Sequence, residues 1–163
     1  MTPNTLTFIA LCNEYCQTVE AAPNSEQREF VNSMLGLLPR IYITARALES
    51  DGALDEGFID QALDEDSYNS IAEGLQVVMG EDDTFLEVFE EDMKYSDTPV
   101  AAAVSELLAD LYQVCFNFIA TVREAPEDVV ASAVAATKEE FEMYWAQTLC
   151  NVLRPLNAIY YRQ

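Results

Sequence analysis

The chain has 163 residues, half of them hydrophobic, so residues 1–163 are expected to form a single domain with its own core. Its formal net charge is −21, from 29 acidic against 8 basic residues, which disfavours binding to a nucleic-acid backbone or to anionic lipid. It contains no histidine, which excludes Ser-His-Asp triads, Cys-His dyads, HExxH zinc sites and di-iron bundles with histidine ligands.

Apolar residues at helical spacing predict two helices at the start of the chain. The first is expected over 5–21, because apolar side chains recur every three or four positions before Pro23 and Asn24. Ser25 is expected to cap the second helix, which continues to about Leu48. The short connection around Pro23 makes these two helices antiparallel neighbours.

The second helix has two unusual positions. Pro39 removes one backbone hydrogen bond, so we expect a kink there. Ile43 falls opposite the main apolar stripe, which predicts that this helix is either central in the bundle or part of an interface.

The middle of the chain has weaker signals. Residues 49–66 contain two glycines, many acids and a short apolar patch of Phe58, Ile59 and Leu63, and they are expected to form a loop with a helical turn. A third helix is expected over 66–79, ending at Gly80, and a short acidic helix over 84–91.

Two long helices are expected in the last part of the chain. The first begins with Ser96 or Asp97 as its cap and Pro99 in its first turn, and continues until Pro126. The second begins at Glu127 and reaches about residue 159, with a bend or end near Pro155. The predicted fold class is therefore all-α: an antiparallel up-and-down bundle of four main helices plus one or two short helices.

The four cysteines lie at positions 12, 16, 115 and 150, each within an apolar helical pattern. This placement is typical of buried free thiols; a metal site would require Cys115 and Cys150 to approach Cys12 and Cys16. The first residues lack the features of a secretory signal, and no apolar run reaches the length of a membrane span. We therefore expect a cytoplasmic protein without a cofactor.

The acidic residues offer one weak metal hypothesis. Glu87 and Glu90 form an ExxE pair, as in all-helical nucleotide pyrophosphohydrolases that bind Mg²⁺ with ExxE and a later ExxD. The second half is missing, because Glu106 is followed by Ala109 at the required position. A solvated acidic face is the simpler interpretation.

A few basic and aromatic residues suggest a pocket for an anionic or aromatic ligand. In a protein this acidic, a cation either pairs with an internal carboxylate or awaits an anion. The candidate pocket residues are Arg40, Tyr42, Arg46, Trp145 and Arg154. Ion pairing within the protein is the simpler alternative for the three arginines, and packing in the core is the simpler alternative for the aromatic residues.

Three segments carry a resemblance to a known family: Phe8-Ile9-Ala10-Leu11-Cys12-Asn13-Glu14-Tyr15-Cys16, Leu35-Gly36-Leu37-Leu38-Pro39-Arg40-Ile41-Tyr42, and 149–161. With these segments the chain resembles an uncharacterised bacterial family described only as a domain of unknown function. The resemblance implies a helical, cytoplasmic protein and supplies no functional residues.

The leading functional hypothesis is a non-catalytic protein-interaction or regulatory module. It would bind a protein partner, with a basic protein as one candidate, through an apolar patch or its acidic face, and it would bind neither nucleic acid directly nor a membrane. One special form would be mimicry of nucleic acid by spaced carboxylates. The alternatives are a Mg²⁺-dependent hydrolase and a small anionic ligand-binding protein.

Overall fold

The computed structural model describes residues 1–50, 57–87 and 100–162. The helices are α1 (Pro3–Glu20), α2 (Gln27–Arg46), α3 (Glu65–Met79), α4 (Val104–Val122), α5 (Glu127–Glu140) and α6 (Ala146–Tyr161). Two strands, β1 (Thr84–Leu86) and β2 (Ala101–Ala103), pair in antiparallel fashion, and single helical turns form at Ala22–Asn24 (η1), Gly80–Asp83 (η2) and Phe141–Trp145 (η4). The predicted all-α class is confirmed.

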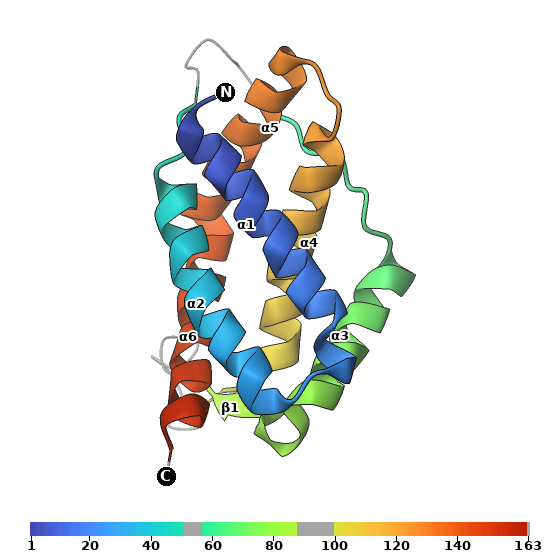
Figure 1. Cartoon of the computed structure of the whole chain (residues 1–163), viewed down its shortest axis with the longest axis vertical. Helices are drawn as coiled ribbons and strands as arrows, with labels where there is room; N and C mark the ends of the chain where they lie inside the picture. Colours follow the sequence, from blue (N-terminus) through green and yellow to red (C-terminus); the bar gives the residue numbers. More distant parts are fainter. Residues whose placement is uncertain (51–56, 88–99, 163) are drawn as a thin grey trace.

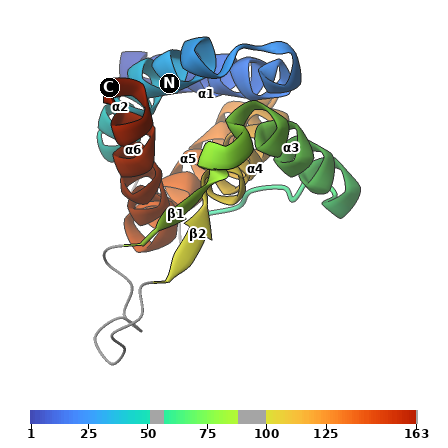
Figure 2. The ribbon, with the colours of Figure 1, turned by 90° about the horizontal axis from the view of Figure 1, so that it is seen from below.

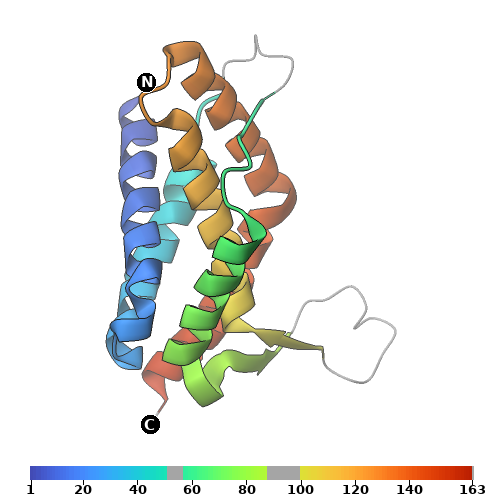
Figure 3. The ribbon, with the colours of Figure 1, turned by 90° about the vertical axis from the view of Figure 1, so that its right-hand side faces the viewer.

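Four long helical columns form the bundle, with α5, η4 and α6 making one column (Figure 1). Contacts run from α1 to α2, from α2 to α6, from α6 to α4 and from α4 back to α1, and each of these neighbours is antiparallel (Figures 1 and 3). Columns α2 and α4 occupy opposite corners and run in the same direction. The chain between them crosses from one end to the other and carries α3, which packs beside α4 and η1.

The N-terminal ends of the first two helices differ from expectation. Helix α1 begins at Pro3, and the Thr2 hydroxyl caps it by accepting a hydrogen bond of 3.1 Å from the backbone N–H of Thr5. The predicted cap at Ser25 is wrong, because its hydroxyl donates to the carbonyl oxygen of Ala21 at 2.8 Å and α2 begins only at Gln27. The hydroxyl of Ser25 therefore closes the preceding turn.

Helix α2 continues through Pro39, and the kink expected there stays a prediction. The position of Ile43 is confirmed: its side chain is 66% exposed, while the main stripe of α2 is buried against the neighbouring helices. Ile43 is thus one of the exposed large apolar side chains of the described chain.

The segment before α4 is the largest departure from the predicted elements. The acidic helix expected over 84–91 is wrong at its start, because residues 84–86 form β1; residues 88–91 lie outside the described residues. The helix expected from Ser96 or Asp97, with Pro99 in its first turn, begins instead at Val104, after β2; those three residues also lie outside the described chain. The strands extend outward from one end of the bundle (Figure 2).

The start of α4 is fixed by a residue distant in sequence. The carboxylate of Asp83 accepts hydrogen bonds from the backbone N–H and the hydroxyl of Ser105, both at 2.7 Å. This carboxylate satisfies a donor in the first turn of α4 from outside the helix. A cap supplied by a distant residue leaves no local sequence signal, which is why the predicted start was wrong.

Residues 57–64 connect to α3 in an extended conformation and contain no helical turn. The helical turn expected within 49–66 stays a prediction, because residues 51–56 lie outside the described chain. Of the apolar patch predicted here, Leu63 is buried and Ile59 packs against the core, but Phe58 is 62% exposed. The buried amide of Asn117 accepts from the backbone N–H of Leu63 at 2.9 Å. A polar side chain inside the bundle thereby satisfies a backbone N–H of this connection.

The core is one continuous apolar cluster with an aromatic centre. Phe8 of α1 lies 5.1 Å from Phe118 of α4 and 6.4 Å from Trp145 of η4, measured between ring centroids. All three side chains are at most 4% exposed. Among the described residues, no helix has both the length and the apolar character needed to cross a bilayer.

The prediction of four buried thiols holds for three. Cys12, Cys16 and Cys115 are buried between α1 and α4, whereas Cys150 is exposed. Burial raises the pKa of the Cys16 thiol, and the hydrogen bond that the protonated Cys115 thiol makes to Cys12, together with burial, raises the pKa of Cys115. Cys150 lies next to fully buried Leu149 but about 100° around the helix, so its side chain reaches solvent.

This arrangement predicts selective thiol chemistry. In the native protein, 5,5′-dithiobis(2-nitrobenzoate) should label one thiol quickly, and all four after unfolding in guanidinium, because only exposed thiols react readily. The Cys150→Ser variant should lose the fast phase, and Cys16→Ser should keep it. Fast labelling of two or more thiols in the native protein would contradict the burial of the other three.

Candidate functional site

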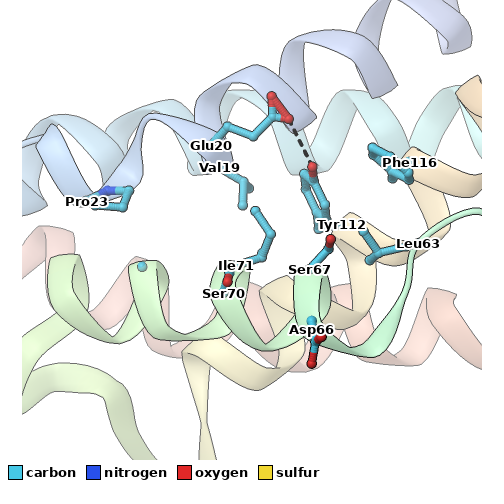
Figure 4. A pocket seen from close by; sticks show the side chains of 11 residues that line it. Val19, Glu20, Pro23, Leu63, Asp66, Ser67, Ser70, Ile71, Tyr112 and Phe116 are labelled. Carbon is cyan, nitrogen blue, oxygen red and sulfur yellow. Dashed lines mark hydrogen bonds between the residues drawn. The ribbon is translucent and has the colours of Figure 1, made fainter.

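A cleft of about 390 Å³ opens where α3 crosses the end of α1 and the middle of α4 (Figure 4). Its lining comes from three parts of the chain: Val19, Glu20 and Pro23; then Leu63, Asp66, Ser67, Ser70, Ile71 and Gly74; and finally Tyr112 and Phe116. Three elements from distant parts of the sequence thus share one opening.

The cleft exists because one face of α3 carries small side chains. Ser67, Ser70 and Gly74 follow one another at spacings of three and four, so they lie on the same face of the helix. A Cβ atom added to Gly74 would lie 2.7 Å from Cγ of Pro23, so α3 approaches η1 closely at this end. The two short serine side chains leave space between α3 and α4 farther along.

The N-terminal end of α3 is held in place by its own cap. The Asp64 carboxylate accepts a hydrogen bond of 2.7 Å from the backbone N–H of Ser67, and this bond lowers the pKa of Asp64. On the adjoining turn, the hydroxyl of Tyr68 donates to the carboxylate of Asp110 in α4 at 2.6 Å. Helix α3 is therefore anchored on α4 directly beside the cleft.

Tyr112 forms the floor of the cleft. Its side chain is 3% exposed, and its hydroxyl donates to Oε2 of Glu20 at 2.9 Å, drawn as the dashed line in Figure 4. Burial first, and then the neighbouring Glu20 carboxylate, raise the pKa of Tyr112, so its hydroxyl stays protonated at neutral pH. The ring of Phe116 stacks beside that of Tyr112, with 5.7 Å between centroids.

The lining suits recognition of a cation that has an apolar stem. The Glu20 carboxylate supplies negative charge, Phe116 supplies a partly exposed aromatic ring of the kind that attracts cations, and Val19 and Ile71 point toward one another as an apolar wall (Figure 4). None of the eleven lining residues is basic, so no side chain of the cleft itself competes for the carboxylate. The lining also holds neither cysteine nor histidine.

Comparison with known proteins places this fold in a family. A family model for a domain of unknown function, DUF5063, matches residues 1–162. The chain belongs to the DUF5063 family. The resemblance identified from the sequence is thereby confirmed. Membership of this family supports the fold and assigns no activity.

One crystal structure supports the architecture of this family member. Protein BF1032 from Bacteroides fragilis is similar with a TM-score of 0.83 at 24% sequence identity, over 99% of this chain and 95% of that one. At this identity the likeness shows the fold alone. Comparison with curated proteins gave no significant match.

The residues predicted to form an anionic-ligand pocket lie in several different places. The Arg40 side chain is 4.0 Å from the carboxylate of Glu14, and its Nε donates to the carbonyl oxygen of Gly36 at 3.0 Å. Arg46 is exposed near the end of α2 and forms no ion pair within the described chain. Neither arginine lines the cleft.

The two aromatic members of that prediction meet through Phe141. Tyr42 lies edge-on to the Phe141 ring at 5.3 Å, and Trp145 does so at 4.5 Å. Trp145 is buried, and its indole N–H donates to the carbonyl oxygen of Thr137 at 3.3 Å. These rings belong to the core, the alternative that the sequence analysis left open.

The last member, Arg154, holds the strand pair against α6. Its guanidinium donates to the carbonyl oxygen of Leu86 and lies 5.8 Å from the ring centroid of Phe85. Lys138 similarly donates to the carbonyl oxygen of Leu48 at 2.6 Å, just after α2. These two basic side chains thus satisfy carbonyl groups at the ends of elements. A pocket that unites all five predicted residues stays a prediction.

The metal hypothesis gains no ligand set within the described residues. Glu87 is buried and its backbone N–H donates to the carbonyl oxygen of Val100 at 2.8 Å, but Glu90 lies outside the described chain. Over the described ranges, no three Cys, Asp or Glu side chains are grouped so that they could hold a metal ion. The thiols of Cys12, Cys16 and Cys115 therefore do not form such a group either.

The sequence analysis did not identify the cleft. A third helix was predicted over 66–79, and the structure places Ile71 of this helix at the edge of the cleft. The sequence signal for the cleft was the neighbouring face of the third helix, where serines and a glycine recur at helical spacing. Small residues on one face of a helix indicate either close packing or an opening, and here both occur.

Proposed function

We propose that the protein is a non-catalytic interaction module that holds a positively charged segment of a partner protein in the cleft between α1, α3 and α4. The observation that carries this proposal is the placement of the Glu20 carboxylate beside Tyr112 and Phe116 in a cleft that has no basic lining residue. A lysine or arginine side chain matches this lining in charge and in its apolar stem.

The net charge of the whole chain also favours a basic partner. A net charge of −21 attracts basic partners over long distances and accelerates their encounter. The cleft would then supply the local recognition that a uniformly acidic surface lacks. Its volume of about 390 Å³ lies in the range of pockets that bind small ligands or single side chains.

The proposal predicts that blocking the cleft abolishes binding of basic peptides. Fluorescence anisotropy would follow labelled pentapeptides with a central arginine or lysine, and versions with norleucine at that position. Ser70→Phe should weaken binding of the charged peptides at least tenfold by filling the cleft, and Glu20→Gln should weaken it about fivefold by removing the charge while keeping an acceptor for Tyr112.

Matched variants distinguish the cleft from general effects. Asn69→Phe places the same ring on an exposed neighbouring position of α3, and Glu142→Gln removes the same charge from an exposed position on η4. Both should bind as the unmodified chain does. Equal binding by Ser70→Phe and Asn69→Phe, or no preference for the charged peptides over norleucine, would overturn the proposal.

A further inference from the structure

A second cavity continues the cleft along the groove between α1 and α4. It has a volume of about 210 Å³ and shares two lining residues, Glu20 and Phe116, with the first. The other lining residues include Asn13 and Gln17 of α1 and Arg123 at the end of α4. Since both cavities include the same two side chains, they form one groove with a junction at Glu20.

Helix geometry gives the direction and length of this extension. Asn13 precedes Glu20 by seven residues in α1, and Arg123 follows Phe116 by seven residues from α4. Because α1 and α4 are antiparallel, both steps lead the same way, away from the half of the cleft that α3 covers (Figures 1 and 3). Seven residues of helix rise by about 10 Å, which separates the two ends of the groove.

The two ends of the groove have opposite charge. Glu20 provides a carboxylate at the junction, whereas Arg123 provides a guanidinium at the far end, near the amides of Asn13 and Gln17. Arg123 is exposed and forms no ion pair or side-chain hydrogen bond within the described residues. Several other basic side chains, such as Lys138 and Arg162, are bound to groups of the protein itself. Arg123 is thus available to an anion.

We infer that the groove binds an extended peptide that carries a basic side chain and a carboxylate two or three residues apart, with the basic group at Glu20 and the carboxylate at Arg123. An extended chain advances about 3.3 Å per residue, so three residues cover the separation of the two charged groups. This inference rests on the proposed function and specifies its partner. The carboxylate is an acidic side chain of the partner.

A double-mutant cycle tests the contact with Arg123. The labelled peptides carry an arginine and, two or three residues away, a glutamate or a glutamine, all with amidated C-termini; a further peptide offers a free C-terminal carboxylate at the same spacing. In the unmodified chain, glutamate to glutamine should weaken binding at least fivefold. In Arg123→Gln that loss should fall below twofold, because the partner of the carboxylate is gone.

Controls separate this inference from the proposed function. Arg46→Gln removes an exposed arginine outside the groove and should retain the fivefold loss. One outcome is that Glu20→Gln weakens peptide binding while replacing glutamate with glutamine in the peptide lowers the affinity equally for the unmodified chain and for Arg123→Gln. In that case the inference is wrong and the proposed function stands. If Glu20→Gln and Ser70→Phe leave all peptides unaffected, the proposed function fails as well. Preference for the free C-terminal carboxylate over glutamate would identify a chain end as the ligand.

Discussion

Replacing Phe8 with alanine should lower the free energy of unfolding by about 3–5 kcal/mol, the range for removal of a large aromatic side chain from a packed core. Phe8 is fully buried and joins three columns of the bundle through its ring contacts with Phe118 and Trp145. The loss combines the apolar surface removed from the core, the cavity left behind and two aromatic contacts. Because domains of this size are stable by about 5–15 kcal/mol, the variant should be close to unfolding.

The measurement can use the chain's own fluorescence. Trp145 is the single tryptophan and lies against Phe8, so its emission should follow unfolding in urea directly. Leu6→Ala is the matched control on the same helix, since the Leu6 side chain is 56% exposed and its loss should change stability by less than about 0.5 kcal/mol. A cost below about 1.5 kcal/mol for Phe8→Ala would contradict the central role given to this ring.

The helices could be predicted where a single helix face decides the structure. Apolar side chains at helical spacing located α1, α2, α3 and the column from α5 to α6 within a few residues, because burial of one stripe dominates the energetics of a long amphipathic helix. Pro23 and Pro126 also marked two connections between antiparallel helices. These features depend on residues close in sequence, so the sequence alone carries them.

The predicted elements were wrong where contacts between residues distant in sequence determine the local structure. The start of α4 depends on the Asp83 carboxylate bound to Ser105, a contact across 22 positions. Strand β1 depends on pairing with β2, and three-residue strands are too short for alternation to be recognised. Local propensity in an acidic stretch favoured a helix, and tertiary contacts overrode that preference.

The cleft and groove could not be predicted for a related reason. Their lining comes from three regions of the chain that become neighbours only because the connection after α2 crosses the bundle and brings α3 beside α1 and α4. Catalytic and metal-binding motifs are recognised by residue types at a fixed spacing, whereas this surface is made of an acid, aromatic rings and hydroxyls without a fixed spacing. The basic residues were partly anticipated, since ion pairing within the protein was the simpler alternative for three arginines and describes Arg40. Within the described residues it describes neither Arg46 nor Arg154, whose guanidinium donates to a backbone carbonyl oxygen.

Gly57→Ala should destabilise the protein by about 2–3 kcal/mol, since steric overpacking against a rigid neighbour typically costs this much. A Cβ atom at position 57 would lie 2.3 Å from the backbone nitrogen of Ala136 in α5, and the helix backbone cannot move aside cheaply. The extended segment would have to lift away from α5. It would then lose the 3.2 Å hydrogen bond from the Phe58 N–H to the Ser132 carbonyl oxygen and weaken the burial of Leu63.

The same substitution at Gly36 should act in the opposite direction. Gly36 lies inside α2, an added Cβ would meet no neighbouring element within 4 Å, and alanine is better than glycine in a helix by about 0.8–1.0 kcal/mol. Urea unfolding of the two variants, read from Trp145 fluorescence, should therefore differ by about 3 kcal/mol although each gains a single methyl group. Equal stability would mean that residues 57–64 do not pack on α5, and the connection that carries α3 to the cleft would then lack its anchor.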